Sequence, residues 1–247
     1  MALEGRLNPI TAGGSMPLDA PLYAKPPIFY KGVETIGITY ETDPEAACNM
    51  LPEGLILPEP VTATLLLIHY PWSTLGPYQE AILGLSCIWE GEGRFYIAHI
   101  AVNSDVPQAA GREIWGYPKK MASITMETEG DIVWGKMERP TGHLIFTAGI
   151  RPEIPVEEPP AAGGGGLSLR VIPSPEESAP PSVAELIEVP PRNNVTLESW
   201  TGPGWATYHS SSNLDPWHRL GIKRILGASY RKYDMELGFG RIVKRYG

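Results

Sequence analysis

Glycine and proline interrupt this chain so often that they restrict what it can fold into. The sequence contains 27 Gly and 26 Pro among 247 residues. Proline breaks a helix interior and glycine weakens it, so few stretches are long enough for the helices of a bundle. The runs between these residues are short and apolar, which is typical of a β-rich fold with many turns. Hydrophobic residues make up 43% of the chain, enough for a sizeable core.

The apolar runs have the periodicity of strands. In residues 32–42, Ile36, Ile38 and Tyr40 alternate with polar neighbours, as in a half-buried strand. Several later runs are apolar on both faces, which indicates a closed barrel or a covered sheet. Strands are predicted at 62–70, 80–89, 94–102, 122–128, 132–137, 143–150, from 167 onward, and at 183–189, 195–200 and 227–244.

Helices are expected to be few and short. Asp43 and Pro44 have the types preferred at a helix start, so a short helix is predicted after them. A second short helix is predicted within 215–225. Residues 182–185 have capping-box spacing and could begin a helix. Because prolines follow that run closely, a strand is favoured there.

The chain is predicted to form one domain over residues 1–247. Residues 1–27 carry five prolines and a Gly-Gly pair, which indicates an extended N-terminal arm. Residues 151–166 contain four prolines and end in four glycines, which predicts a flexible surface loop. Apolar alternation resumes directly afterwards, so this loop is not taken as a domain boundary.

Composition narrows the possible functions. The formal net charge is −8, so the chain lacks the basic excess that nucleic-acid binding needs. No apolar segment resembles a secretory signal or a membrane span. We therefore expect a cytoplasmic protein with no nucleic-acid or membrane partner. Neither the two cysteines, Cys48 and Cys87, nor the five histidines have the spacing of metal ligands, so no metal site is predicted.

One segment, residues 111–120 (Gly-Arg-Glu-Ile-Trp-Gly-Tyr-Pro-Lys-Lys), has the residue types that imine chemistry needs. A lysine must lose its proton before it can attack a carbonyl, and its ordinary pKa is about 10.4. Burial and a second nearby cation both lower the pKa of a lysine. Lys119 lies between apolar or aromatic neighbours and directly before Lys120. A Lys-Lys pair in a loop is usually solvated, so this spacing alone does not decide the function.

The same decapeptide resembles the active-site signature of the acetoacetate decarboxylase family, whose reactive lysine is activated by a cationic neighbour. Other stretches resemble the family in the same order, so that the likeness spans residues 25 to 245. They are Tyr-Glu-Thr-Asp at 40–43, Leu-Pro-Glu at 51–53, Leu-Gly-Pro-Tyr-Gln-Glu at 75–80, Arg-Val-Ile-Pro at 170–173 and Glu-Ser-Trp-Thr-Gly-Pro at 198–203.

The resemblance implies roles for particular residues. Lys119 is expected to be the Schiff-base nucleophile, and Lys120 the neighbour that lowers its pKa. Glu80 is expected to face the imine, where it orients the substrate or moves protons. Tyr78 would share a strand face with Glu80 as a hydrogen-bond donor, and Trp115 is expected beside the substrate.

The resemblance also implies a fold and partners. The family has a mainly β (α+β) fold, in which a curved, mostly antiparallel sheet closes into a cone-like barrel with a few short helices. Its members form homo-oligomers, which is expected here too. The partner would be a small oxo acid, with or without an aldehyde. No metal or organic cofactor is expected, because the lysine itself accepts the electrons.

Two departures from the family pattern bear on the reaction. The family carries an arginine in its first strand, and here Lys31 is the nearest cation. It also carries a second glutamate upstream of the one that matches Glu80, and the spacing puts Leu65 in that substrate-facing position. These losses favour an aldolase-dehydratase that joins pyruvate, or a similar 2-oxo acid, to an aldehyde. A decarboxylase of acetoacetate or another 3-oxo acid is the alternative, and a non-catalytic oxo-acid-binding protein is the second alternative.

Overall fold

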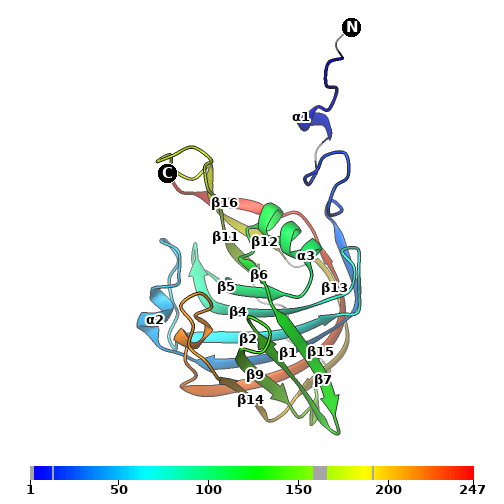
Figure 1. Ribbon diagram of the computed structural model, residues 1–247. Coiled ribbons are helices and arrows are strands. Elements are labelled where there is room, and N and C mark those ends of the chain that lie inside the picture. The colour runs from blue at the N-terminus through cyan, green and yellow to red at the C-terminus, as the bar shows by residue number, and fades with distance from the viewer. Residues whose placement is uncertain (1–2, 13, 158–165, 191) are drawn as a thin grey trace.

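The computed structural model describes residues 3–12, 14–157, 166–190 and 192–247, and it is built mainly of strands (Figure 1). A twelve-stranded sheet has the order β10-β13-β15-β1-β2-β4-β5-β11-β12-β16, with β3 paired to β1 and β6 to β5. The sheet curls into a cone-like shape, and a four-stranded sheet, β14-β9-β8-β7, packs against it (Figure 1). The predicted mainly β fold, a curved and mostly antiparallel sheet with a few short helices, is confirmed.

Most ladders are antiparallel, and only β5-β6 and β5-β11 are parallel. The strands of the larger sheet are β1 (Ile28–Glu41), β2 (Thr62–Tyr70), β3 (Trp72–Ser73), β4 (Tyr78–Trp89), β5 (Glu92–Val102), β6 (Lys119–Met121), β10 (Ile154–Pro155), β11 (Gly166–Ile172), β12 (Val183–Val189), β13 (Arg192–Thr201), β15 (Arg224–Leu237) and β16 (Arg241–Arg245). The smaller sheet contains β7 (Ser123–Glu129), β8 (Ile132–Glu138), β9 (Leu144–Ile150) and β14 (Gly204–Tyr208). The helices are α1 (Pro9–Ala12), α2 (Pro44–Cys48), α3 (Asp105–Ala110), the π-helix η1 (Gly111–Trp115) and the 3-10 helix η2 (Trp217–Arg219).

Two predictions of secondary structure were wrong. The helix expected within 215–225 is only the single turn η2, because the Asp215 carboxylate binds Lys120 and Arg139 instead of beginning a longer helix. The last strand, expected over 227–244, is divided into β15 and β16. Between them Gly240 passes so close to β12 that a Cβ there would meet the carbonyl oxygen of Glu188 at 2.9 Å.

The strands are apolar on both faces because they separate two cores. On β2, Leu65 and Leu67 point toward the four-stranded sheet and join a large cluster with its side chains. The alternate residues Ile68 and Tyr70 belong to a second cluster, which lies inside the curve of the larger sheet. The interior of the cone is therefore lined separately from the main core.

Strand register aligns one row of residues across the inner face. Glu80 of β4 is opposite Ile68 of β2, Ile68 is opposite Thr35 of β1, and Thr35 is opposite Arg231 of β15. Directly opposed residues of antiparallel neighbours lie on the same face of a sheet. Side chains far apart in the sequence therefore project into the same interior.

The structure describes most of the predicted N-terminal arm but only part of the predicted loop at 151–166. The arm includes α1 and projects away from the body of the molecule (Figure 1). Most of the predicted flexible loop lies outside the described residues, namely 158–165. Before them, Ile154–Pro155 forms β10 and pairs with β13.

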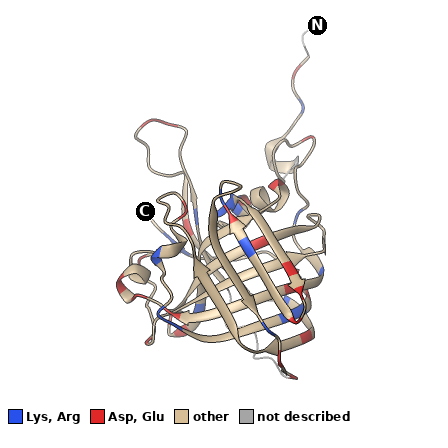
Figure 2. Cartoon of the chain, turned by 60° about the horizontal axis from the view of Figure 1, so that its bottom comes forward, with Lys and Arg blue, Asp and Glu red and all other residues tan. Residues whose placement is uncertain are grey.

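Acidic and basic residues are mixed along the strands on the face that Figure 2 presents, so neither sign forms one continuous patch in that view. In the described part of the chain, no helix has the length and apolar character needed to cross a membrane.

Candidate active site

A tight turn after η1 delivers Lys119 to the interior of the cone. The π-helix ends at Gly116, whose φ of 71° is left-handed. A Cβ at Gly116 would lie 2.5 Å from the Cα of Arg170, so only glycine fits both the conformation and the space. The chain then enters β6, where Lys119 lies beside Ile100 of β5.

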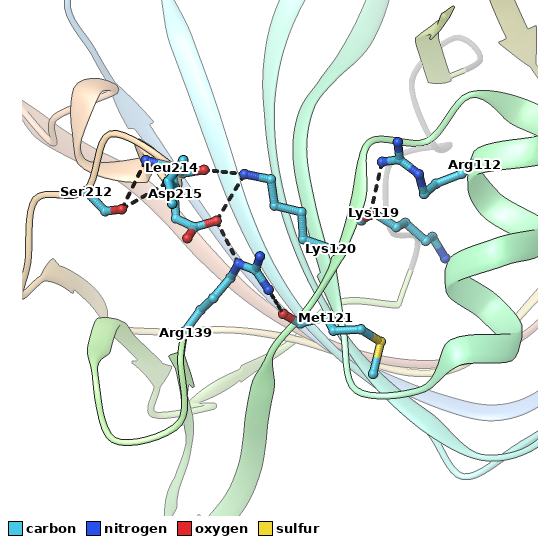
Figure 3. A network of polar contacts seen from close by, with 8 residues as sticks. All are labelled: Arg112, Lys119, Lys120, Met121, Arg139, Ser212, Leu214 and Asp215. Atoms are coloured by element: carbon cyan, nitrogen blue, oxygen red, sulfur yellow. Dashed lines mark hydrogen bonds and ion pairs between the residues drawn. The ribbon is translucent and has the colours of Figure 1, made fainter. Parts of the chain in front are cut away.

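Gly111 provides room for the stem of the lysine. A Cβ at this position would lie 2.6 Å from Cδ and 2.7 Å from Cε of Lys119. The peptide oxygen of Lys119 also accepts a hydrogen bond of 3.3 Å from Arg112 (Figure 3). The glycine and the arginine of the motif therefore position Lys119 from two sides.

Lys119 forms a buried ion pair with Glu80. Its Nζ lies 2.6 Å from Oε2 of Glu80, and the two side chains are only 6% and 5% exposed. The ammonium also lies 5.5 Å from the ring centre of Tyr78 and 5.8 Å from that of Tyr117. The other carboxylate oxygen of Glu80 accepts a hydrogen bond of 3.1 Å from the hydroxyl of Tyr70. The structure thus brings together three residues that the sequence predicted, Lys119, Glu80 and Tyr78.

Buried tyrosines form the wall around this pair. Tyr70 and Tyr78 stack with ring centres 4.4 Å apart, and the hydroxyl of Tyr78 donates to that of Tyr30 at 3.3 Å. Burial raises the pKa of each of these phenols, and the negative charge of Glu80 raises the pKa further. Burial raises the pKa of Tyr117 as well. All four phenols therefore keep their protons at neutral pH and act as neutral groups.

Lys120 points away from Lys119. Side chains alternate along a strand, so the two lysines of β6 leave it on opposite faces, as Figure 3 shows. The Lys120 ammonium contacts the carbonyl oxygen of Leu214 and lies 3.2 Å from the carboxylate of Asp215. Arg139 contacts the same carboxylate at 3.0 Å. Lys120 thus ties β6 to the segment before η2.

Trp115 supports the turn from behind. It is 1% exposed, its indole nitrogen donates to the carbonyl of Gly238 at 3.0 Å, and its ring stacks on Tyr117 at 5.7 Å. Its peptide oxygen accepts from Ser168 at 2.5 Å. It therefore reaches the lysine through Tyr117.

Leu65 lies on the opposite side of the sheet from the predicted site. It is aligned with Ile38 and Leu83, and all three belong to the core under the four-stranded sheet. Its neighbours Thr64 and Leu66 line the interior cavity instead. A shift of one residue along a strand exchanges its two faces, and counting residues from Glu80 could not resolve such a shift. The placement does not fit the expectation that Leu65 binds substrate.

A cavity of about 840 Å³ lies on this inner face. Tyr117, whose ring lies 5.8 Å from the Lys119 ammonium, lines it, whereas Lys119 and Glu80 themselves do not. Thr39, Thr64, Leu66, Phe95 and Met235 also line it. Arg231 lines it too, and its Nε is buried without a hydrogen-bond partner among the described residues. No sequence motif marked this arginine, because it lies on a strand distant from the lysine segment and faces the interior only through strand register.

The charges of both Arg231 and Glu80 act on the phenol of Tyr233. Tyr233, two residues beyond Arg231 on β15, shares a hydrogen bond of 3.1 Å with Thr35. Burial is the main cause that raises the pKa of Tyr233, and the hydrogen bond with Thr35 lowers that pKa. The negative charge of Glu80 raises it, and the positive charge of Arg231 lowers it. Both charged groups therefore act on the same phenol from the interior.

The pair of Lys119 and Glu80 has a definite chemical capacity. Two opposite charges in a buried contact become neutral together when one proton moves from the ammonium to the carboxylate. The result is a nucleophilic amine beside a carboxylic acid. Within the ranges that the structure describes, no group of three or more His, Cys, Asp or Glu side chains could hold a metal ion. The fold and this site define a class of protein, a curved and mostly antiparallel β-sheet with a buried lysine on its inner face.

Comparison with known proteins identifies the family. The sequence profile named acetoacetate decarboxylase (ADC) matches residues 15–247, and this chain belongs to the acetoacetate decarboxylase family. It is 30% identical to acetoacetate decarboxylase 1 of Bradyrhizobium diazoefficiens, over 94% of this chain and 93% of the relative.

Solved structures agree with this assignment. An acetoacetate decarboxylase from Legionella pneumophila is 27% identical and superposes with a TM-score of 0.87, over 100% of this chain and 99% of that one. The enduracididine biosynthesis enzyme MppR, solved with the condensation product of pyruvate and imidazole 4-carboxaldehyde, has a TM-score of 0.80 at 21% identity, over 99% of this chain and 100% of its own. At that identity the likeness shows the fold alone.

Proposed function

We propose that this protein is a decarboxylase of 3-oxo acids that forms an imine through Lys119. The observation that carries the proposal is the 2.6 Å contact between Lys119 Nζ and Glu80 inside a wall of neutral phenols. Two features of the sequence had favoured an aldolase-dehydratase, the missing arginine and Leu65. Leu65 lies in the other core and does not face Lys119, so it no longer favours the aldolase-dehydratase. The decarboxylase names of the relatives at 30% and 27% identity support the same choice.

The first half of the reaction makes an imine. One proton moves from Lys119 Nζ to the Glu80 carboxylate, which leaves a neutral amine and a carboxylic acid. The amine nitrogen attacks the ketone carbon of the 3-oxo acid, and the adduct loses water to give a protonated imine. Tyr70 holds the carboxyl of Glu80 in place through its 3.1 Å hydrogen bond.

The second half breaks the carbon–carbon bond. The bonding electrons between the carboxylate carbon and the α-carbon move into the protonated imine, carbon dioxide leaves, and an enamine forms. Glu80 gave up its proton when the adduct lost water, so it takes a new proton from water and passes it to the α-carbon. Water then hydrolyses the protonated imine to release the ketone and Lys119. A buried apolar wall favours this step, because the negative charge of the carboxylate disappears as carbon dioxide forms. Tyr78 and Tyr117 supply the part of that wall nearest the ammonium.

An aldolase-dehydratase is the second candidate, and the size of the cavity favours it. At about 840 Å³ the cavity is near the upper end of ordinary small-molecule sites, which hold ligands of drug size. It therefore has room for an aldehyde beside pyruvate. The imine and enamine would be the same, but the enamine would attack the aldehyde and the adduct would then lose water.

Product analysis separates these reactions. The protein is incubated with acetoacetate, and then with pyruvate and an aromatic aldehyde, while carbon dioxide, ketone and conjugated 2-oxo acid are measured. We expect carbon dioxide and acetone in equal amounts from the wild type, and neither from Lys119→Met. Lys120→Met is the matched control, because it removes the adjacent lysine from the opposite face of β6. Conjugated product without carbon dioxide would favour the aldolase-dehydratase. Binding of oxo acid with no product in either assay would favour the binding protein.

A further inference from the structure

Arg231 lines the cavity without a salt-bridge partner among the described residues, and the carboxylate of Glu236, which lines the same cavity, accepts a hydrogen bond from Asn193 instead. Arg231 takes part in none of the ion pairs that join described residues, and its Nε is buried and unpaired. Arg94, another arginine of the cavity wall, is neutralised by Glu188 at 2.8 Å. A buried polar atom without a hydrogen-bond partner is costly, so the buried Nε of this half-buried arginine suits a site that an anionic ligand completes.

Arg231 faces the same interior as Lys119 but from a different side. It shares a row with Glu80, and the row crosses three strand intervals, from β4 through β2 and β1 to β15. Neighbouring strands are about 4.8 Å apart, so the path along the sheet between the two Cα atoms is roughly 14 Å. Ile68 and Thr35 occupy the row between them.

This separation is too large for both groups to act on adjacent atoms of a small acid. The carboxylate that leaves a 3-oxo acid is two bonds from the imine carbon, so it must stay beside Lys119. A cation on that carboxylate would also stabilise the charged ground state more than the transition state, which does not accelerate the reaction. A cation on a remote group stabilises both states equally and so serves recognition.

We propose that Arg231 binds a second, non-reacting carboxylate of the substrate, and that the natural substrates are therefore 3-oxo dicarboxylic acids. This inference rests on the proposed function, because it takes the imine of Lys119 as the fixed end of the substrate. The chain between the two ends is aliphatic. Leu66 and Met235, which line the same cavity as Arg231, supply apolar surface for it.

Matched substrate pairs test the inference. Values of kcat/KM are measured for 3-oxoadipate and 3-oxosuberate, and for 3-oxohexanoate and 3-oxooctanoate, the monoacids of equal chain length. The ratio of diacid to monoacid isolates the contribution of the second carboxylate. We expect the wild type to favour the diacids, and Arg231→Met to lower that ratio by roughly 10- to 100-fold, the loss typical of a hydrogen bond to a charged group. Arg231→Lys should keep part of the preference.

Lys232→Met is the matched control. Lys232 is the next residue of β15, points to the other face and lies 3.6 Å from Glu34. Its loss removes one positive charge from the same strand and should leave the ratio unchanged. An equal ratio in wild type and Arg231→Met, or a wild type that prefers the monoacids, would overturn the inference.

An inert ligand separates this inference from the proposed function. Calorimetry measures the binding of suberate and of octanoate, neither of which has a ketone, so neither depends on imine formation. We expect suberate to bind the wild type more tightly than octanoate does, and Arg231→Met to weaken only suberate. If no oxo acid is decarboxylated and this pattern holds, the proposed reaction fails while the anion site stands. If decarboxylation occurs and suberate binds both proteins equally, the anion site fails alone.

Discussion

Gly111→Ala should disable Lys119 with little effect on the fold. The new Cβ would lie 2.6 Å from Cδ and 2.7 Å from Cε of Lys119, whereas carbon atoms in contact prefer 3.5–4.0 Å, so the stem must move by about 1 Å. A displacement of about 1 Å in a catalytic group costs roughly 100-fold in rate. We therefore expect kcat/KM for decarboxylation to fall by about that factor.

The backbone at Gly111 does not oppose the change. Its φ of −60° and ψ of −48° are helical, and alanine is preferred to glycine in helices by about 1 kcal/mol. Overpacking costs about 1–3 kcal/mol, so the free energy of unfolding should fall by no more than about 2 kcal/mol. The effect on activity is thus predicted to exceed the effect on stability.

The assay follows imine formation by borohydride trapping and decarboxylation by carbon dioxide release, with urea unfolding in parallel. Gly227→Ala is the control, because a Cβ at Gly227 on β15 meets no atom within 4 Å. The control should match the wild type in every assay. If Gly111→Ala trapped and turned over substrate at the wild-type rate, the role of this glycine in positioning Lys119 would be refuted.

Three further predictions concern charge and pH. Lys120→Met should lower the free energy of unfolding by only about 1 kcal/mol, because Asp215 keeps Arg139 as a partner. The rate of imine trapping at Lys119 should stay near that of the wild type. A fall in that rate of about tenfold or more would instead support the predicted role of Lys120 as an activating cation. Burial, together with the positive charge of Lys120, lowers the pKa of His99 to about 4. Its contribution to stability is therefore complete above its ordinary pKa of 6.5 and disappears as pH falls toward 4. Urea unfolding at both ends of this window should show that His99→Gln lacks up to about 3 kcal/mol of acid destabilisation. Burial raises the pKa of Tyr30, Tyr70 and Tyr78, so their contribution to stability is complete below the ordinary value of about 10 and is lost at higher pH. Near-ultraviolet absorbance should show that these phenols ionise only as the protein unfolds in alkali. Ionisation near pH 10 in the folded protein would contradict the burial of these phenols.

The strand pattern and the lysine motif were predictable because they depend on local sequence. Alternation placed β2, β4, β5 and β12 close to their observed bounds, and the choice of a strand over a helix at 183–189 was correct. The short helix α3 before the motif was not predicted. Pro107 is its third residue, and in a sequence without periodicity this proline points to a loop.

The rest of the site depends on long-range register, which local sequence does not encode. Arg231 faces Glu80 across the interior only because four strands align in one row. Leu65 was misplaced because one residue decides which face of β2 a side chain occupies. The position of Lys120 follows from β6 being a strand, whereas the motif alone is equally compatible with a loop. The expected homo-oligomer and cytoplasmic location remain predictions.

Intact-protein mass after borohydride reduction in the presence of acetoacetate tests the central claim most directly. We expect the wild type to gain the mass of one isopropyl group, peptide mapping to locate this group on Lys119, and Lys119→Met to gain nothing. Lys120→Met should be modified like the wild type. A wild type that gains no mass under conditions in which it binds the oxo acid, or an adduct on a lysine other than Lys119, would contradict the account.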